Sequence, residues 1–207
     1  MKLLLFLLTN SIIYASSYPN FTKNELKKFT GHSGIITKNR VLDYAKSVDS
    51  FKKLPKQNQL ISVNHYLNQL PHKTDMLNNK QSDYWETPKE FLTCGYGDCE
   101  DYAIIKYFTL LKLGFSKDKL FITTAFEKYT GQYHMVLSYF EEEDKPPLVL
   151  DNLSYKVLDL KKREDLKADI FISPAGTYKL DNFNKLIKVD KVPEKFIDLL
   201  ERVKKES

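Results

Sequence analysis

Gly95–Ala103, which reads GYGDCEDYA, joins a glycine turn to the start of a long apolar helix and decides the fold of this chain. Apolar residues recur at helical spacing over 104–113, and Gly114 follows as a typical residue after a helix C-terminus. Asp98 lies at the N-cap position. Cys99 therefore lies in the first turn of the predicted helix, where the positive end of the helix dipole favours the thiolate, the nucleophilic form of cysteine.

A cysteine nucleophile needs a base and a group that orients the base. Among the four histidines, His134 stands out because it lies in a segment, 133–140, that alternates like a strand and is rich in residue types that are usually buried. Asp151 ends the apolar run of the next predicted strand. The sequence thus predicts Cys99 as nucleophile, His134 as base and Asp151 as orienting acid. Taken singly, His134 could equally be a histidine whose ring finds its hydrogen-bond partners within the sheet, and Asp151 could equally be a residue that forms a turn.

The rest of the chain divides into helices followed by strands. Helical spacing and proline stops predict helices over 38–54 and 56–70, and Thr87, Pro88 and Glu90 predict the capped start of a short helix over 88–92. After the central helix, the spacing of the apolar residues changes from the helical period to a period of about two residues. This pattern predicts strands, and an amphipathic helix is predicted after them at the end of the chain. Two segments show no regular pattern. Residues 18–34 look like an irregular arm, and residues 73–82 look like a polar connection. The expected strands cover 119–126, 133–140, 147–153, 155–160 and 170–173, and the last helix covers 193–204.

This order predicts an α+β fold with helices packed on an antiparallel sheet. The chain of 207 residues is long enough for one domain. Residues 1–17 have a basic start, a short apolar core and small residues near Ala15 and Ser17, which predicts a cleaved secretory signal peptide. An uncleaved anchor or a buried helix is the alternative. We therefore expect an exported, soluble protein with one domain over 18–207 and no stable membrane insertion.

The charge of the chain gives little support to a nucleic-acid partner. The formal net charge is +5, and the basic residues alternate with acids, as in the run KKRED at 161–165. Such runs are typical of a solvated surface. The sequence therefore predicts no nucleic-acid binding.

The two cysteines, Cys94 and Cys99, lie five positions apart. An exported protein often pairs its cysteines, so a structural disulfide is one reading of this spacing. A bridge across so short a loop would stabilise little and would consume the nucleophile. A reversible, regulatory bridge is a further hypothesis.

Four linked blocks of the sequence resemble the bacterial transglutaminase-like cysteine proteinases. They are WETPKEFL at 85–92, GYGDCEDYAIIKY at 95–107, HMVL at 134–137 and LVLDNL at 148–153. The resemblance covers roughly 63–153 and implies a papain/transglutaminase-like fold, with the three roles of Cys99, His134 and Asp151 as above. It also implies a periplasmic protease that cleaves the N-terminal region of a large surface adhesin and so controls biofilm attachment. An inner-membrane receptor that sequesters the protease is a further implied partner.

The resemblance implies calcium as well, and the residues supply a separate reason. Asp98, Glu100 and Asp101 place three carboxylates around one thiol, and such negative charge raises the pKa of a thiol. A divalent cation would neutralise these acids, and oxygen ligands suit calcium rather than zinc. Asp98 and Glu100 are the first ligand candidates and Asp101 the third, with carbonyls or waters completing the shell. Alternatively, Asp98 caps the helix and the other two acids complement its dipole.

Two other functions share these sequence features. A transglutaminase-like enzyme would transfer the acyl group from the thioester to an amine instead of to water. A calcium-stabilised binding module would keep the three residues without catalysis.

Overall fold

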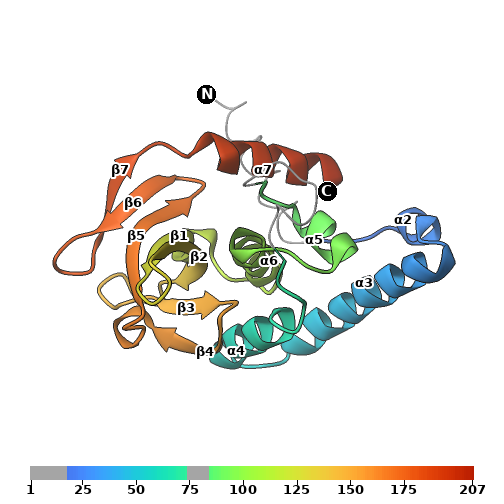
Figure 1. Cartoon of the computed structure of the whole chain (residues 1–207), viewed down its shortest axis with the longest axis horizontal. Helices are drawn as coiled ribbons and strands as arrows, with labels where there is room; N and C mark the ends of the chain where they lie inside the picture. The colour runs from blue at the N-terminus through green and yellow to red at the C-terminus, as the bar shows by residue number, and fades with distance from the viewer. Residues whose placement is uncertain (1–17, 74–83) are drawn as a thin grey trace.

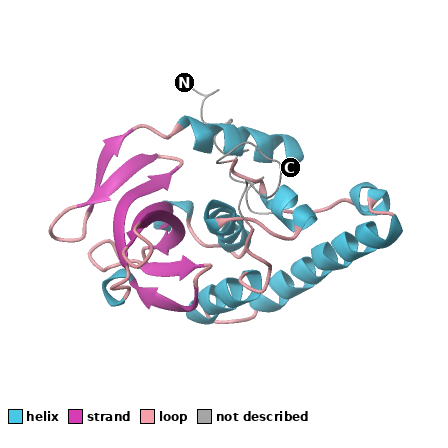
Figure 2. Cartoon of the chain, viewed as in Figure 1, coloured by secondary structure: helices cyan, strands magenta, loops and turns pink. Residues whose placement is uncertain are grey.

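The computed structural model describes residues 18–73 and 84–207, so the predicted signal peptide and most of the polar connection lie outside the described residues. The chain runs from helices into a single antiparallel sheet and returns to a helix (Figures 1 and 2). The helices are α2 (Lys23–Lys28), α3 (Gly31–Phe51), α4 (Lys56–Leu67), α5 (Pro88–Cys94), α6 (Cys99–Lys112) and α7 (Glu194–Glu206). The strands are β1 (Leu120–Glu127), β2 (Gln132–Tyr139), β3 (Leu148–Asp151), β4 (Ser154–Asp159), β5 (Leu166–Ser173), β6 (Gly176–Leu180) and β7 (Leu186–Asp190).

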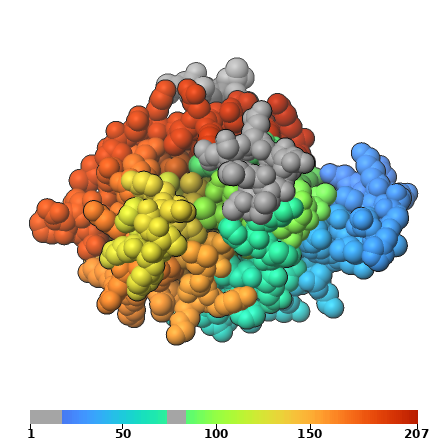
Figure 3. All heavy atoms as spheres, in the orientation of Figure 1, coloured from blue at the N-terminus to red at the C-terminus, as the bar shows by residue number. Residues whose placement is uncertain are grey.

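The seven strands follow the order β4-β3-β2-β1-β5-β6-β7, and every pair is antiparallel. Helix α6 lies in the middle of the molecule, between the curved sheet on one side and α5 on the other (Figure 1). Helices α2 and α3 extend beyond the rest of the molecule at one end, which the space-filling view shows in blue (Figure 3). The predicted α+β fold is confirmed.

Strands β2 and β3 are buried on both faces of the sheet, because successive side chains point to opposite faces and apolar residues lie on each. Leu137 of β2 and Leu150 of β3 belong to the main core, which the sheet shares with α6. Val136 and Val149, one position away on the same strands, pack with Ala125 and others in a second cluster on the opposite face. This two-sided burial explains why apolar residues occupy adjacent positions in β2 and β3, as at Val136–Leu137 and Val149–Leu150.

Local capping signals account for the helix starts around the glycine loop. At α5, the Thr87 hydroxyl accepts the amide of Glu90 at 3.2 Å, and the Glu90 carboxylate accepts the amide of Thr87 at 2.7 Å. The predicted capped start at this position is confirmed. Gly95 ends α5 with a left-handed φ of 80°, a conformation that glycine adopts at little cost.

The structure corrects the sequence prediction in two regions. Residues 18–34 were expected to be irregular, but Thr22 and Glu25 form a capping box that starts α2, and α3 already begins at Gly31. Strands β6 and β7 were not predicted at all. Residues 186–190 are mostly exposed on an edge strand, so they lack the alternating burial that marks a strand in sequence. The other elements are found as predicted, with ends shifted by a few residues.

Candidate active site

The loop between α5 and α6 brings Cys99 to the first position of α6. Gly97 lies against this helix start so closely that a Cβ atom on it would meet the Asp101 carboxylate at 2.6 Å. No larger residue fits there without moving the helix. The glycines therefore allow the loop to turn tightly enough to place Cys99 beside the sheet.

The Cys99 thiol donates a hydrogen bond to Oε2 of Glu100, with an Sγ–Oε2 distance of 3.2 Å. Burial raises the pKa of the thiol, and the negative charges of Glu100 and Asp98 raise it further, while the backbone amide of Met135 in β2 opposes them. The sequence predicted that the helix dipole would favour the thiolate. In the structure burial and the neighbouring acids outweigh that effect, so the resting thiol is held in its protonated form.

His134 and Asp151 form a buried pair on neighbouring strands. Nε2 of His134 lies 2.7 Å from Oδ1 of Asp151, and the two residues are only 8% and 1% exposed. They meet because β2 pairs antiparallel with β3, which places both side chains on the face that carries Val136 and Val149. The two residues predicted from their separate strands are thus brought together.

The Asp151 carboxyl is held in its ionised form. Burial alone would raise its pKa, but hydrogen bonds from His134, the Leu153 amide and Arg163 outweigh burial and keep the pKa well below the usual range. An ionised carboxylate only accepts hydrogen bonds, so Nε2 of His134 carries the proton. Nδ1 is then the nitrogen that can accept a proton.

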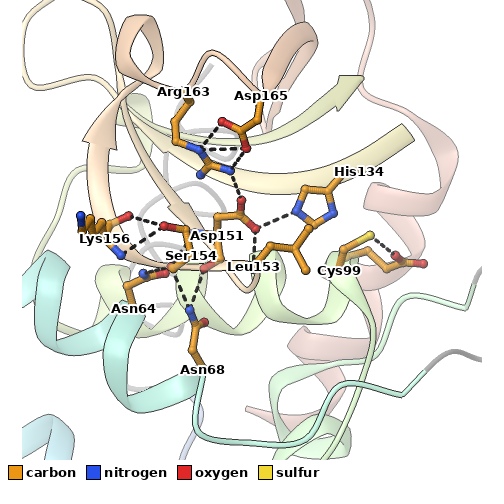
Figure 4. Close-up of polar contacts among 11 residues, drawn as sticks. Asn64, Asn68, Cys99, His134, Asp151, Leu153, Ser154, Lys156, Arg163 and Asp165 are labelled. Carbon is orange, nitrogen blue, oxygen red and sulfur yellow. Dashed lines mark hydrogen bonds and ion pairs between the residues drawn. The ribbon is translucent and has the colours of Figure 1, made fainter. Parts of the chain in front are cut away.

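Figure 4 shows the imidazole of His134 between the carboxylate of Asp151 and the side chain of Cys99. The Met135 amide, one residue after His134, is the backbone group that reaches the sulfur. Within the described part of the chain, the thiol is hydrogen-bonded to Glu100 and not to the imidazole. The arrangement can support thiol chemistry once the thiol turns from the carboxylate to Nδ1.

Helix α4 holds the backbone on either side of the turn after Asp151. The Asn64 side chain accepts the Asp151 amide at 3.0 Å and donates to the Ser154 carbonyl at 2.7 Å. Asn68, one turn later, donates to the Asp151 carbonyl at 2.7 Å. Sequence reasoning missed both asparagines. Two amide side chains at i and i+4 that interrupt the buried side of an amphipathic helix were the available signal.

The three acids around Cys99 are not arranged as a set of metal ligands. Asp101 accepts the backbone amides of Glu86 at 2.7 Å and of Asp98 at 3.3 Å, and Glu100 accepts the thiol. In residues 18–73 and 84–207, no group of three or more His, Cys, Asp or Glu side chains is placed to hold a metal ion. The chemistry of the donors, all carboxylate oxygens, nevertheless fits calcium.

Two further observations concern the described residues. Cys94 and Cys99 are both free thiols, so the structural disulfide is not formed. None of the described helices is both long enough and apolar enough to cross a bilayer.

Comparison with known proteins identifies a related family and similar solved structures. The sequence profile of the bacterial transglutaminase-like cysteine proteinases (BTLCP) matches residues 41–165, more than half of the chain. Calcium-bound LapG of Legionella pneumophila is 35% identical, with a TM-score of 0.73 over 87% of this chain and 96% of that chain. EGTA-treated LapG is 33% identical, with a TM-score of 0.75 over 93% and 97% of the two chains. A search of curated proteins gave no match.

The matched region contains the glycine loop, α6 and the strands β1 to β4 that carry His134 and Asp151. The agreement in fold extends beyond it, over most of the chain in the LapG comparisons. This protein therefore belongs to the bacterial transglutaminase-like cysteine proteinases and is a cysteine peptidase with a LapG-like fold.

Proposed function

We propose that this protein is a calcium-dependent endopeptidase of the periplasm, with Cys99 as nucleophile, His134 as base and Asp151 as orienting acid. Its proposed substrate is the N-terminal region of a large surface adhesin, whose cleavage would control biofilm attachment. The observation that carries the catalytic part is the 2.7 Å contact between His134 and Asp151, beside a cysteine at the start of α6. The substrate and its cellular role rest on the family resemblance.

The geometry supports a defined order of proton transfers. Nδ1 of His134 takes the thiol proton, and the sulfur of Cys99 attacks the peptide carbonyl carbon. The imidazolium then protonates the leaving amine as the C–N bond breaks, which leaves a thioester on Cys99. His134 next removes a proton from water, which attacks the thioester, and the proton returns to the sulfur as the acid product leaves. Asp151 keeps the proton on Nε2 throughout, so that Nδ1 carries out each transfer.

The test is incubation of the purified protein with N-terminal fragments of large surface proteins from the same cell. We expect one discrete new N-terminus in the wild type and in Cys94→Ser, and none in Cys99→Ala, since only the latter loses the proposed nucleophile. A Cys99→Ala protein that still cleaves would overturn the assignment. A parallel reaction with a primary amine separates hydrolysis from acyl transfer, because a transferase would give an amide-linked product.

Calcium is proposed to bind at the carboxylates of Asp98 and Glu100, with Asp101 as a third ligand. When bound, the cation would neutralise the negative charge beside the Cys99 thiol. The support comes from the oxygen-rich donor set and from the calcium-bound form of the similar LapG structure. It is also consistent with the negative charges of Glu100 and Asp98, which raise the pKa of the thiol.

Calcium binding is tested by calorimetric titration and by thermal melting with and without EGTA. We expect calcium to raise the melting temperature of the wild type, and Asp98→Ala or Glu100→Ala to abolish both the binding heat and the shift. Glu142→Gln, which alters an exposed acid paired with Lys145, is the matched control and should behave as wild type. Equal melting temperatures in excess calcium and in EGTA would rule the site out.

The receptor and the location are tested separately. We expect the protein recovered from the periplasm to begin close to residue 16 or 18, because the proposed signal peptide ends there. We also expect an inner-membrane protein to co-purify with Cys99→Ala after crosslinking in intact cells. A protein that retains Met1 and stays in the cytoplasm would contradict the proposed location.

A further inference from the structure

Arg163 reaches the candidate active site from a segment whose sequence indicates solvated surface. It follows the short 3-10 turn Leu160–Lys162 in the connection between β4 and β5. Its amide donates to the Leu160 carbonyl, and its carbonyl accepts the Leu166 amide, so the backbone folds tightly at this point. The guanidinium points inward as a result, and the residue is only 6% exposed.

The guanidinium bridges two carboxylates (Figure 4). Nη2 lies 2.6 Å from Oδ2 of Asp151 and 2.6 Å from Oδ2 of Asp165, and Nε donates to Oδ1 of Asp165 at 2.9 Å. Asp165 therefore binds the guanidinium through both Nε and Nη2 and fixes its orientation. The result is a continuous chain of contacts from Asp165 through Arg163 and Asp151 to the ring of His134.

The two oxygens of Asp151 have separate partners. Oδ1 accepts Nε2 of His134 and the Leu153 amide, while Oδ2 accepts Arg163. Lys106 is a second basic side chain, on whose pKa the charge of Asp151 acts, but its Nζ makes no hydrogen bond among the described residues. The rotation of the carboxylate about its side-chain bond is thus set by Arg163 on one side and by His134 on the other.

Stability alone is a weak reason for this network. Buried ion pairs often contribute little net stability, because removing the charges from water offsets their attraction. Nη1 of Arg163 is buried and has no hydrogen-bond partner in the described residues, which adds a further desolvation cost. A network that brings little stability but determines the direction of one carboxylate is better explained by the geometry it imposes.

We propose that Arg163, held in place by its hydrogen bonds to Asp165, is a positioning residue for catalysis. It holds the carboxylate of Asp151 turned so that Oδ1 meets Nε2 of His134, which holds the imidazole in the tautomer with Nδ1 unprotonated. This inference rests on the proposed protease function of Cys99, His134 and Asp151. The alternative is that Arg163 only ties the β4–β5 connection to the sheet.

The test uses Arg163→Gln, Arg163→Lys and Asp165→Asn, with Arg202→Gln as the control. Arg202 is also an ion-paired arginine, bound to Glu90 at 2.9 Å, but it belongs to α7. The ring tautomer of His134 is read from nitrogen chemical shifts in long-range proton–nitrogen NMR spectra, with the signal assigned through His134→Gln. Cleavage of the adhesin fragment supplies kcat and KM separately.

In the wild type we expect a single His134 tautomer with the proton on Nε2. Arg163→Gln should give a mixture of tautomers and lower kcat at least about tenfold, or about 1.4 kcal/mol, with KM little changed. Arg163→Lys keeps the positive charge but lacks the planar guanidinium with its several N–H donors, so it should retain part of the kcat that Arg163→Gln loses. Asp165→Asn should be intermediate, and Arg202→Gln should lower the melting temperature without moving the tautomer or kcat.

Two outcomes separate this inference from the proposed function. If the wild type cleaves the fragment and Arg163→Gln keeps the single tautomer and the wild-type kcat, the positioning role is wrong while the protease function stands. If no fragment is cleaved but Arg163→Gln still gives a mixture of His134 tautomers, Arg163 positions Asp151 and His134, and the protease function is wrong. Should Arg163→Gln fail to fold, the same two readouts on Arg163→Lys and Asp165→Asn decide.

Discussion

At Cys99 the positive end of α6 and the carboxylate of Glu100 act on the same sulfur atom. The helix dipole favours the thiolate, but its effect is modest and falls off within one turn. Burial and the adjacent carboxylates act more strongly here and raise the pKa of the thiol. A low-pKa thiol therefore cannot be inferred from a helix N-terminus alone, because the neighbouring acids and the depth of burial set the sign of the shift.

Asp151→Asn should destabilise the protein at neutral pH and much less in acid. The pKa of the Asp151 carboxyl is depressed by its partners, which outweigh burial. A group of this kind stabilises the folded state above its unfolded pKa of about 3.9 and loses that contribution as the pH falls through the folded value. We expect a loss of about 3 kcal/mol at pH 7, since a buried pair is broken. Urea unfolding at pH 7 and pH 2 measures it, and an equal loss at both pH values would contradict the prediction.

Lys106→Met should stabilise the protein. Lys106 is fully buried, and burial lowers its pKa from 10.5 to about 7, with Asp151 acting in the opposite direction. The unfolded chain binds this proton more tightly, so the lysine destabilises the fold most at pH 7 and below, and not above about pH 10.5. The gain should reach up to about 4 kcal/mol near pH 7 and shrink toward pH 10.

The check for Lys106→Met is urea unfolding at pH 7 and pH 9.5. Lys161→Met, which changes an exposed lysine, is the control and should alter stability little at either pH. A Lys106→Met protein that is less stable than wild type at both pH values would mean that the buried ammonium supports Asp151 more than its desolvation costs.

At the scale of elements, α4 and the β3–β4 turn determine where the acid of the pair lies. Asp151 is the last residue of β3, and a four-residue strand by itself positions its end loosely. Asn64 and Asn68 compensate by bonding to both backbone groups of Asp151, so that the turn takes its position from a helix. The helical hairpin predicted from 38–54 and 56–70 thus has a specific role, since its second helix supports the active site.

Asn64→Ala should loosen the β3–β4 turn. The side chain is fully buried, and its removal leaves the Asp151 amide without its partner and the Ser154 carbonyl with Asn68 as its remaining side-chain donor. We expect a loss of about 2 kcal/mol and faster hydrogen exchange at the Asp151 amide. Gln69→Ala, on the exposed side of the same chain segment, should leave that exchange rate unchanged. Unchanged protection of the Asp151 amide in Asn64→Ala would show that the strand alone holds the turn.

At the scale of the whole molecule, one apolar core connects the two ends of the described chain. It includes Tyr18 before the first helix, Tyr107 in the middle of α6, and Phe196 and Val203 of α7. The terminal helix therefore completes the core that the central helix begins. This continuity favours the single domain over 18–207 that the sequence predicts.

Phe196→Ala should destabilise the entire protein in one transition. The ring is fully buried, with its centroid 6.5 Å from that of Trp85 and 6.2 Å from that of Tyr107. Loss of such a side chain costs about 3–5 kcal/mol through lost burial and a residual cavity. Ile197→Ala, one position along and 42% exposed, is the control and should change little. Calorimetry checks this, and two separate transitions in either variant would contradict a single domain.

How far the site could be predicted differs from residue to residue. Cys99, His134 and Asp151 could be found because each marks a local irregularity, a reactive or polar side chain next to a regular apolar pattern. Arg163 and Asp165 could not, because the run at 161–165 has the same composition as any solvated turn. Strand β7 was missed for a related reason, since it is an edge strand whose side chains are mostly exposed and carry no burial pattern.

The sequence by itself determined the helix that presents Cys99, the period of the strands and the identity of the three proposed catalytic residues. These depend on spacing, capping and turn chemistry, which act between residues close along the chain. Only the tertiary structure decided which imidazole nitrogen meets Asp151, that Arg163 is buried against it, and that burial together with the acids outweighs the helix dipole at the Cys99 thiol. The direction of a side chain and its pKa depend on neighbours distant in sequence, and packing alone brings those neighbours together.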